Sequence, residues 1–473
     1  MDFLESLESL IVAANGIFWG LPLFILIAGV GLLLTLRLGL IQVRLFPLAV
    51  SHLVRSFGQK DNGKEGDISP FQALSTALSG TMGIGNIAGV STAIVLGGPG
   101  AVFWMWAIAL IGMATKYSEA VLAIKYRGKA ADGTIAGGPM YYIERGLNNR
   151  WLALAFAGCG MVATIGGGAM AQANSISQGI TSQLSFDWAI SVPSIGQVSL
   201  IGTAIGLALV LFTGLVIFGG IKRIGRVTSW VIPIMSVFYV GGGLLVMAIN
   251  YDKLPGAAML IFQHAFLPYA VAGGAIGYTI SEAIRYGVAR GVFTNEAGLG
   301  SAPVAYAASK ARSPVEQGLL AMLEVFIDTI LTCSITAFVV LSSGLWDDGL
   351  TSTALTIGAF SDALGPAGLA VVLISTILFG YSTIIGWSYY GEQFTAYLLG
   401  QRWRGAFKAA YLSTVLLGTV LGVELVWEIA DLSNGLMAIP NLVALAALSG
   451  VVAMETRKYF ERGIKVEAEP PRQ

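Results

Sequence analysis

Charged residues are scarce in this chain. Asp, Glu, Lys and Arg together make up 11% of its 473 residues, whereas an ordinary soluble domain has roughly 25%. So few charges cannot cover the surface of a soluble protein of this length, and a mean hydropathy of +0.75 agrees with this. The 27 basic and 27 acidic residues balance, so net charge gives no reason to expect a nucleic-acid partner.

Cysteine and histidine are rarer still, with two of each. Cys159 and Cys333 both lie within apolar runs, so we expect free thiols rather than a disulfide framework. The sequence contains no HExxH, CxxC or Walker lysine motif. It therefore indicates neither a metalloenzyme nor an ATP-driven pump, and without a recognisable catalytic set we predict that the protein is not an enzyme.

Long apolar runs recur along the chain, and each is long enough to cross a bilayer as a helix. The runs are continuous, unlike the alternating strands of a membrane β-barrel. The N-terminus, MDFLESLESL, is acidic, unlike the basic start of a signal peptide, so we expect the first run to be retained. We predict eleven spans, at residues 16–36, 70–97, 101–125, 151–181, 198–220, 227–250, 266–290, 315–343, 367–398, 406–425 and 429–453.

The charged loops predict an orientation. If the spans alternate strictly, nearly all Lys and Arg fall on one side, among them those of the segment 285–313, and Lys253 is the exception. Because cytoplasmic loops carry the excess of Lys and Arg, we predict a multi-pass protein of the cell membrane with its N-terminus outside and its C-terminus in the cytoplasm.

The spans also divide into corresponding halves. We expect an extra N-terminal span with a cytoplasmic loop (1–67), a ten-helix core (68–453) and a cytoplasmic tail (454–473). Within the core, 68–250 and 265–453 each hold five spans, so the two halves have opposite orientations. Each half begins with a glycine-interrupted segment, which is the pattern of inverted repeats in secondary transporters.

The first of these segments, SGTMGIGNIAG at 79–89, contains a GxGxxA pattern. A dinucleotide-binding loop would need a strand before it and an acidic residue about 20 positions later. The preceding FQALSTAL is no convincing strand, and no acidic residue occurs between Asp67 and Glu119. The dinucleotide interpretation therefore fails.

Two interpretations of this segment remain open. Small residues could serve only close helix packing, or the helix could be unwound in mid-membrane because glycine weakens helix propagation. A break exposes N–H groups that suit a carboxylate and carbonyl groups that suit Na⁺ or an ammonium. The second glycine-rich segment, AVAGGAIGYTIS at 270–281, would complete one site for a zwitterion.

Four stretches resemble the alanine or glycine:cation symporter family, also called the sodium:alanine symporters. They are GGPGAVFWMWAIALIGMATKYSE (97–119), GGPMYYIERGL (137–147), QANSI (172–176) and RGVFTNEAGLGSAP (290–303). The resemblance runs nearly end to end. It implies an all-α polytopic membrane protein with a leucine-transporter-like 5+5 inverted repeat plus one extra N-terminal helix. It also implies import of alanine and glycine coupled to Na⁺, or to H⁺ in some members, with no organic cofactor.

The predicted substrate-binding residues come from four spans. Gln172 follows the small residues Gly168 and Ala169 on one helix face, whereas Asn174 lies on nearly the opposite face. Asn86 is expected either to bind substrate or to cap the half-helix, and Trp387 to close the pocket on the cytoplasmic side. The full set is Thr81, Gly83, Ile84, Gly85, Asn86, Gln172, Gly273, Gly274, Ile276, Gly277, Ile280 and Trp387.

A sodium site is predicted where the first interrupted span meets Ser382 and Thr383. In leucine-transporter-like folds, paired hydroxyls on the eighth core helix complete such a site with carbonyls of the first core helix, here those of Gly80 to Gly83. The alternative is ordinary bonding of both hydroxyls to the preceding helical turn.

Carboxylates inside membrane spans are functional candidates by default. Here they are Glu119, Glu324, Asp328 and Glu392. Glu119 lies three residues after Lys116, which favours a structural pair. Asp328 is the best candidate if H⁺ is the coupled ion. We predict a secondary symporter whose partners are a small amino acid and the lipid bilayer; the alternatives are H⁺ coupling or a passive facilitator or channel, although no repeated filter motif is present.

Overall fold

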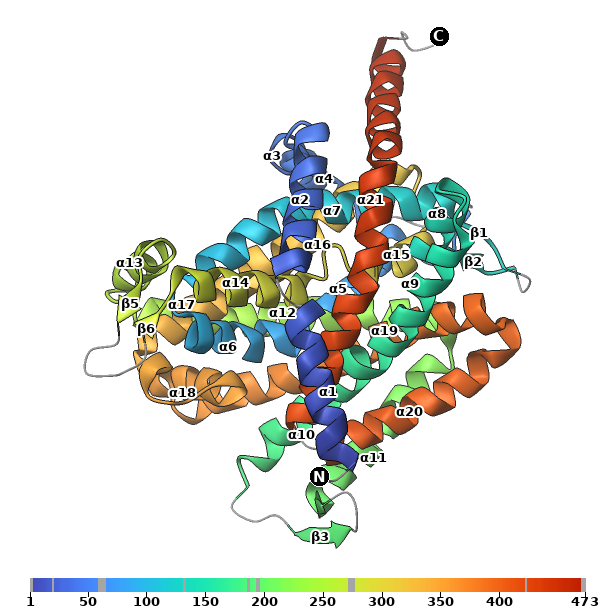
Figure 1. Ribbon diagram of the computed structural model, residues 1–473. Helices are drawn as coiled ribbons and strands as arrows, with labels where there is room; N and C mark the ends of the chain where they lie inside the picture. Colours follow the sequence, from blue (N-terminus) through green and yellow to red (C-terminus); the bar gives the residue numbers. More distant parts are fainter. Residues whose placement is uncertain are drawn as a thin grey trace.

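Helices make up nearly all of the described chain in the computed structural model (Figure 1). The structure describes residues 3–18, 21–57, 65–130, 133–184, 188–192, 196–270, 277–421 and 423–468. The α-helices are α1 (Phe3–Phe18), α2 (Leu21–Arg37), α3 (Ile41–Arg44), α4 (Phe46–Ser56), α5 (Pro70–Thr81), α6 (Ala88–Gly97), α7 (Ala101–Tyr126), α8 (Pro139–Gly146), α9 (Arg150–Ala163), α10 (Ala171–Thr181), α11 (Leu200–Ile217), α12 (Gly220–Ile249), α13 (Leu254–His264), α14 (Ile280–Asn295), α15 (Ala302–Ala307), α16 (Pro314–Val325), α17 (Ser334–Ser343), α18 (Ser352–Leu364), α19 (Pro366–Leu399), α20 (Arg404–Val420) and α21 (Val423–Ala468).

Short 3₁₀ and π-helical segments and three antiparallel hairpins complete the described elements. The 3₁₀ segments are η1 (Ile84–Asn86), η4 (Leu345–Asp347) and η5 (Gln401–Trp403), and the π-helical segments are η2 (Thr164–Met170) and η3 (Phe326–Cys333). Strand β1 (Gly128–Lys129) pairs with β2 (Ile135–Ala136), β3 (Ala189–Val192) with β4 (Gly196–Ser199), and β5 (Tyr269–Ala270) with β6 (Gly277–Tyr278).

Seven continuous helical segments of the described chain are long and apolar enough to cross a membrane. They cover 101–126, 150–181, 200–217, 220–249, 314–343, 366–399 and 426–461. Shorter apolar helices at 22–37 and 88–97 add to them. The chain is therefore a multi-pass membrane protein. Helix α21 continues to Ala468, well beyond the predicted end of the last span at residue 453.

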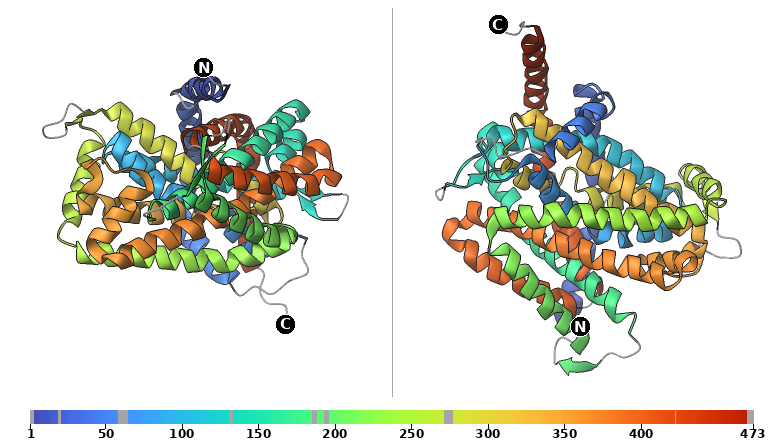
Figure 2. Two further views of the ribbon diagram at one scale, coloured as in Figure 1. Left: turned by 90° about the horizontal axis from the view of Figure 1, so that it is seen from below. Right: turned by 180° about the vertical axis from the view of Figure 1, so that it is seen from behind.

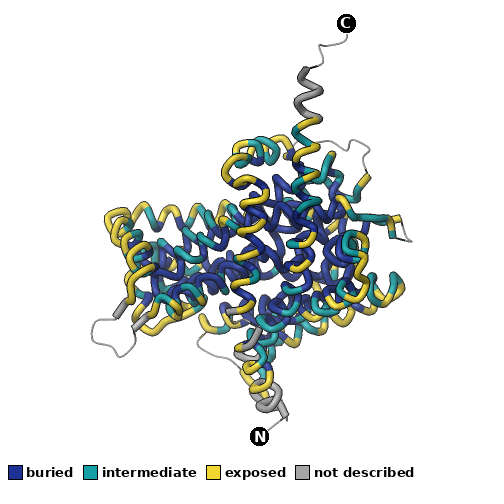
Figure 3. The backbone as a smooth tube through the Cα atoms, turned by 45° about the horizontal axis from the view of Figure 1, so that its top comes forward, coloured by how far each residue is buried: buried dark blue, intermediate teal, exposed yellow. Residues whose placement is uncertain are grey.

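Apolar side chains cover the outside of the molecule as well as its centre. Helices α11 and α12, which Figure 2 shows on the back of the molecule, are only 28% buried in their most apolar windows. Phe212, Trp230 and Val237 are among their exposed side chains. In Figure 3 the exposed residues surround a buried interior. Such an apolar exterior suits lipid rather than water.

The first glycine-rich segment interrupts a helix, as predicted. Helix α5 ends at Thr81, the 3₁₀ turn η1 follows, and α6 begins at Ala88. A second interruption separates α14 from α15. There Glu296, Gly298 and Gly300 have φ of 54°, 94° and 83°, a left-handed backbone region that glycine enters at little cost.

The predicted second interruption, at 273–277, lies almost entirely outside the described residues. Gly273, Gly274 and Ile276 lie outside the described residues, and Gly277 belongs to strand β6. Helix α14 starts only at Ile280 and runs without a break to Asn295. The predicted span 266–290 therefore begins too early, since the helix covers 280–295.

The start of α14 lies beside the end of α6. A Cβ built on Gly97 would be 3.0 Å from the Cβ of Tyr286. The start of α14 with Arg285 therefore lies at the end of α6, whereas the later part of the segment 285–313 lies beside Arg127, which donates to the carbonyls of Ala307 and Ser309. Helix α1 begins at the bottom of Figure 1 and α21 ends at the top.

Hydroxyl groups tie α6 to α18. Thr356 of α18 donates to the backbone carbonyl of Ile87 at 3.0 Å, and its oxygen lies 2.7 Å from that of Ser91. On the other side of the interruption, Thr76 of α5 lies 3.2 Å from the hydroxyl oxygen of Thr228 on α12. The two halves of the broken helix thus contact different neighbours.

Candidate functional site

A small cavity lies at the first interruption. Its volume is about 10 Å³, room for about one water molecule. The residues that line it are Gly80, Thr81, Gly83, Gly85, Gly167, Gln172, Phe293, Glu296, Trp387 and Asn434. They come from both interruptions, from the π-helical segment η2 and from α19 and α21, so the fold brings distant parts of the chain together here.

Gly83 allows side chains to approach the unwound backbone closely. A Cβ at this position would lie 2.7 Å from Thr383 Oγ1 and 3.1 Å from Gln172 Oε1. Gly85 is similarly enclosed, since its Cβ would lie 2.9 Å from Thr294 Cγ2 and 3.2 Å from Phe293 Cδ1. Any larger residue would displace these neighbours.

Gln172 bridges the first interruption and the π-helical segment. Its Oε1 accepts a hydrogen bond from the N–H of Ile84 at 3.2 Å, and its Nε2 donates to the carbonyl of Gly167 at 3.2 Å. Asn174 faces away and donates to the carbonyls of Gly418 and Leu421 at 2.9 and 3.2 Å. The predicted separation of Gln172 and Asn174 onto different faces is present.

Asn86 caps the 3₁₀ turn and holds an acidic side chain. Its Oδ1 accepts from the N–H of Gly83 at 3.0 Å, and its Nδ2 donates to Asp328 Oδ1 at 2.7 Å. Thr329 donates to the other carboxylate oxygen of Asp328 at 2.7 Å. The capping alternative for Asn86 is therefore realised, and Asp328 lies next to the first interruption.

Ser382 and Thr383 both donate to the carbonyl of Phe379, at 2.9 and 3.0 Å. This is the bonding to the preceding turn that the sequence left open. Each hydroxyl has thereby used its proton, while its oxygen keeps lone pairs that can bind a cation. Thr383 Oγ1 adjoins Gly83, so one hard oxygen atom lies beside the unwound backbone of the first interruption. No cluster of His, Cys, Asp and Glu suited to a metal occurs in the described ranges.

Trp387 connects the two interruptions. Its indole N–H donates to Glu296 Oε1 at 2.9 Å, and Ser301 donates to the other carboxylate oxygen of Glu296. Asn434 contributes a buried Oδ1 that lacks a hydrogen-bond partner among the described residues. The lining side chains Phe293, Glu296 and Asn434 were not predicted; the glycines of TNEAGLGSAP were the available signal for the first two.

Ile280 and Gly277 do not lie with this cavity. Phe293, near the end of α14, contacts Gly85, and Ile280 is thirteen residues earlier on the same continuous helix. At 1.5 Å per residue the two positions are roughly 20 Å apart. Ile280, one of the predicted substrate-binding residues, therefore lies away from this cavity, because the interruption comes at the other end of α14.

A buried network of charges supports the second interruption. Lys116 Nζ lies 3.3 Å from Glu324 Oε1 and donates to the carbonyl of Glu296 at 3.3 Å. Glu119 instead accepts from Asn441 at 2.7 Å and from the N–H of Gly298 at 3.2 Å. The predicted pairing of Lys116 with Glu119 is thus replaced by pairing with Glu324 across two helices.

The predictions for the two cysteines and for Glu392 concern residues outside the Lys116–Glu324 network. Cys159 and Cys333 are free thiols, as predicted. Glu392, near the far end of α19, pairs with Lys408 at 3.1 Å and with Arg404 at 3.7 Å. It has cationic partners of its own and does not line the cavity.

Known proteins resemble this chain over most of its length. The sodium/alanine symporter AgcS of Methanococcus maripaludis is 46% identical over 98% of both chains. The probable sodium/glutamine symporter GlnT of Bacillus subtilis is 37% identical over 96% of this chain and 91% of its own. Both alignments span the interruptions and the helices that line the cavity.

A solved structure shares the fold. The crystal structure of MhsT in complex with L-phenylalanine matches with a TM-score of 0.54 at 14% identity, covering 83% of this chain and 98% of that one. This likeness shows a leucine-transporter-like fold. The model of the sodium:alanine symporter family matches residues 4–471. The broken helices and the fold agree with the sequence similarity, and this chain belongs to the sodium:alanine symporter family.

Proposed function

We propose that the protein imports small neutral amino acids, alanine and glycine, together with Na⁺ by alternating access. The observation that carries this proposal is the meeting of Gly83, Gln172 and Thr383 at an interrupted helix. Unwound backbone supplies N–H and carbonyl groups in a buried place, and the adjoining hydroxyls supply hard oxygens. Few other arrangements offer partners for a zwitterion and a monovalent cation within one small cavity.

The substrate carboxylate binds the amides that follow the interruption, near Ile84 and Gly85, where the start of a half-helix favours negative charge; at Ile84 it displaces the Oε1 of Gln172. The substrate ammonium binds acceptor oxygens on the opposite wall. Glu296 and the Oδ1 of Asn434 line the cavity and are of the right kind. Thr81, Gln172 and Trp387 complete the walls, so these predicted residues keep their proposed roles.

Na⁺ binds between the carbonyls of Gly80 to Gly83 and the hydroxyls of Ser382 and Thr383. When bound, the ion neutralises the carbonyl end of α5 and joins it to α19. Without the ion, the hydroxyls of Ser382 and Thr383 are held in place by their hydrogen bonds to the carbonyl of Phe379.

Size selects the substrate. Gly83 and Gly85 are enclosed by side chains within 3.2 Å of an added Cβ, and Phe293 and Trp387 stand on the walls of a cavity of about 10 Å³. A substrate side chain must therefore be small. The cavity must widen to admit any amino acid, and alanine and glycine need less widening than the glutamine in the name of the Bacillus subtilis relative.

Coupling to H⁺ is the second candidate. Asp328 is fully buried and touches the first interruption through Asn86, so its protonation would change the cap of η1. The topology proposed with this function places the N-terminus outside and the C-terminus in the cytoplasm.

Uptake into proteoliposomes tests both candidates. Purified protein is reconstituted, and alanine accumulation is followed with a Na⁺ gradient alone, an H⁺ gradient alone, or neither. Accumulation above equilibrium with Na⁺ alone supports the proposal. Accumulation with H⁺ alone would assign the coupling to Asp328, and equilibration without accumulation under every gradient would identify a passive facilitator.

A further inference from the structure

Three carboxyl groups lie around a single ammonium group at the second interruption. Glu119 of α7, Glu324 of α16 and Glu296, which follows α14, are at most 3% exposed, and Lys116 is fully buried among them. An ionised carboxylate in an apolar interior is costly without a cationic partner. One ammonium group balances one carboxylate, so the other two need a further source of positive charge.

Two of the three carboxyl groups have such a source. Glu324 pairs with Lys116 at 3.3 Å and accepts a hydrogen bond from the hydroxyl of Tyr306. Glu296 accepts from the indole N–H of Trp387 at 2.9 Å and lines the small cavity, where the proposed function places the substrate ammonium. These two groups can therefore be ionised while substrate is bound.

Glu119 receives both of its hydrogen bonds on one oxygen. Its Oε1 accepts from Asn441 Nδ2 at 2.7 Å and from the N–H of Gly298 at 3.2 Å. Its Oε2 is buried and has no hydrogen-bond partner, and Glu119 forms no ion pair, within the part of the chain that the structure describes. A neutral carboxylic acid fits these surroundings, because its carbonyl oxygen accepts both bonds and its other oxygen carries a proton.

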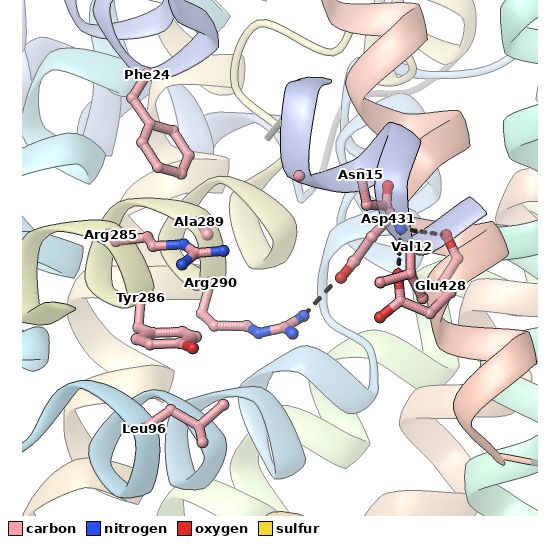
Figure 4. Close-up of a pocket in the computed structure, with 11 residues that line it drawn as sticks. Val12, Asn15, Phe24, Leu96, Arg285, Tyr286, Ala289, Arg290, Glu428 and Asp431 are labelled. Carbon is pink, nitrogen blue, oxygen red and sulfur yellow. Dashed lines mark hydrogen bonds and ion pairs between the residues drawn. The ribbon is translucent and has the colours of Figure 1, made fainter. Parts of the chain in front are cut away.

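Other carboxyl groups inside the fold have their oxygens occupied or their charge balanced. Asp328 accepts from Asn86 on one oxygen and from Thr329 on the other. Asp431 lies 3.6 Å from Arg290 at the wall of a second cavity of about 370 Å³ (Figure 4). The carboxyl group on α7 has neither arrangement, which points to a bound proton.

The same carboxyl group helps to clamp the backbone of the second interruption. Gly298, with a φ of 94°, donates its N–H to Glu119 and accepts from Asn441 Nδ2 on its carbonyl at 2.9 Å. Tyr142 of α8 donates to the amide oxygen of Asn441, so Asn441 presents N–H groups to both neighbours. Glu119 therefore acts on the transport site through the backbone that it holds.

We propose that Glu119 carries a resident proton in the transporting form of the protein, and that loss of this proton switches transport off. Once ionised, Glu119 attracts Lys116, which lies three residues earlier on the same helix face. The ammonium group is then drawn away from Glu324 and from the carbonyl of Glu296, which it contacts at 3.3 Å. The second interruption thereby loses the cation that supports it.

The groups that face Glu119 leave a proton as the remaining source of positive charge. Besides Lys116, the titratable groups whose charge acts on it are Glu324 of α16, Tyr142 of α8 and Tyr306 of α15. Tyrosine is neutral at physiological pH, and Glu324 is itself acidic. Among the described residues, the one cation that acts on Glu119 is thus already paired with another carboxylate.

This inference rests on the proposed function for its readout, because alanine binding reports the state of the second interruption. With substrate bound, the three carboxyl groups then have three different positive partners: Lys116 for Glu324, the substrate ammonium for Glu296 and a proton for Glu119. The proton on Glu119 stays with the protein, unlike the transported H⁺ that Asp328 would bind in the alternative coupling.

The first test compares the pH dependence of alanine binding in the full-length wild type and in Glu119→Gln, at saturating Na⁺. Glutamine copies the neutral carboxyl group and keeps an oxygen that can accept from Asn441 and Gly298, so both proteins should bind alanine equally at mildly acidic pH. As the pH rises and the proton leaves, wild-type affinity should fall roughly tenfold per pH unit, because only the protonated fraction binds. Glu119→Gln should not show this fall. The ammonium group of alanine titrates in both measurements alike.

The matched control is Glu392→Gln. It changes a carboxylate that has cationic partners of its own, Lys408 and Arg404, and it should keep the wild-type pH dependence. The proposal is wrong if wild type and Glu119→Gln lose alanine affinity over the same pH range. Failure of Glu119→Gln to fold would also count against it, because glutamine reproduces the neutral form.

Infrared difference spectroscopy gives a second readout that needs no substrate. A protonated carboxyl group has a C=O stretch separate from the bands of a carboxylate. The spectrum of wild type minus that of Glu119→Gln should contain one such band at mildly acidic pH, and the band should disappear at alkaline pH. A folded wild type without this band would overturn the bound proton.

The two readouts separate this inference from the proposed function. If neither protein binds alanine at any pH while the carboxylic acid band is present and titrates, the proposed function is wrong and the proton on Glu119 stands. If Na⁺ drives alanine uptake normally but the band is absent, the proposed function stands and the proton on Glu119 is wrong.

Discussion

Lys116 and Glu324 form an ion pair of 3.3 Å in which both side chains are 0% exposed. The pair joins α7 to α16, and the same ammonium holds the carbonyl of Glu296 at the second interruption. A cation fixed to the protein therefore supports this interruption, whereas the first interruption is left to a mobile ion in the proposed mechanism.

Removing one partner of this pair should be costly. Lys116→Met leaves a buried carboxylate uncompensated, which typically destabilises a protein by about 3–5 kcal/mol. Lys116→Met with Glu324→Leu should recover much of that loss. Thermal unfolding followed by size-exclusion chromatography measures the effect. The matched control is Lys125→Met, which breaks the exposed Lys125–Glu455 pair of 2.7 Å and should cost at most about 1 kcal/mol. Equal losses in the two single variants would contradict the structural role.

Thr383→Ala should weaken Na⁺ binding. One lost contact to a charged group is worth about 1.5–3 kcal/mol, so Na⁺ affinity should fall roughly ten- to a hundredfold. Linkage then makes alanine binding weak at low Na⁺ and nearly normal at high Na⁺. Thr383→Ser keeps the oxygen and should be mild. Alanine binding across a Na⁺ titration checks this; a loss of equal size at every Na⁺ concentration would show that Thr383 is no sodium ligand.

Gly83→Ala should impair binding although it adds only one methyl group. The new Cβ would lie 2.7 Å from Thr383 Oγ1 and would push the hydroxyl away from the interruption. We expect at least a tenfold loss of alanine affinity, roughly 1.4 kcal/mol. Gly89→Ala is the control, because no heavy atom lies within 4 Å of its added Cβ. Binding by equilibrium dialysis should be near wild type for Gly89→Ala, and similar losses in both variants would remove the special role of Gly83.

The proposed orientation predicts which loops face outside. A cysteine at Thr351, at the start of α18, should react with a membrane-impermeant maleimide in intact cells. A cysteine at Asn148, between α8 and α9, should react only after the cells are opened. Both positions are exposed, so access alone decides the result. The reverse pattern would invert the proposed topology.

Glycine spacing predicted the first interruption because the glycines lie in one short segment, 79–89. The interruption between α14 and α15 was not predicted, because Gly273, Gly274 and Gly277 are a denser glycine signal than Gly298 and Gly300. Gly300 and Gly298 matter through their positive φ, a property of the folded backbone.

Contacts across distant helices were the least predictable part of the site. Lys116 was paired with Glu119 by spacing along one helix, whereas its partner is Glu324 from another. Gln172 was identified from small neighbours on its own face, and it does meet Ile84. Asn434 carries no local signal, since only packing of α21 against the π-helical segment η2 brings it to the cavity.

The interruption also means that α5 and α6 are attached to different neighbouring helices. Thr356 fastens α6 to α18, and Thr76 meets Thr228 of α12 on the side of α5. If α5 and α6 formed one continuous helix, α18 and α12 would be joined through a single rigid element. The 3₁₀ turn η1 interrupts that continuity, so the attachment of α6 to α18 and the attachment of α5 to α12 are held by two separate helical segments.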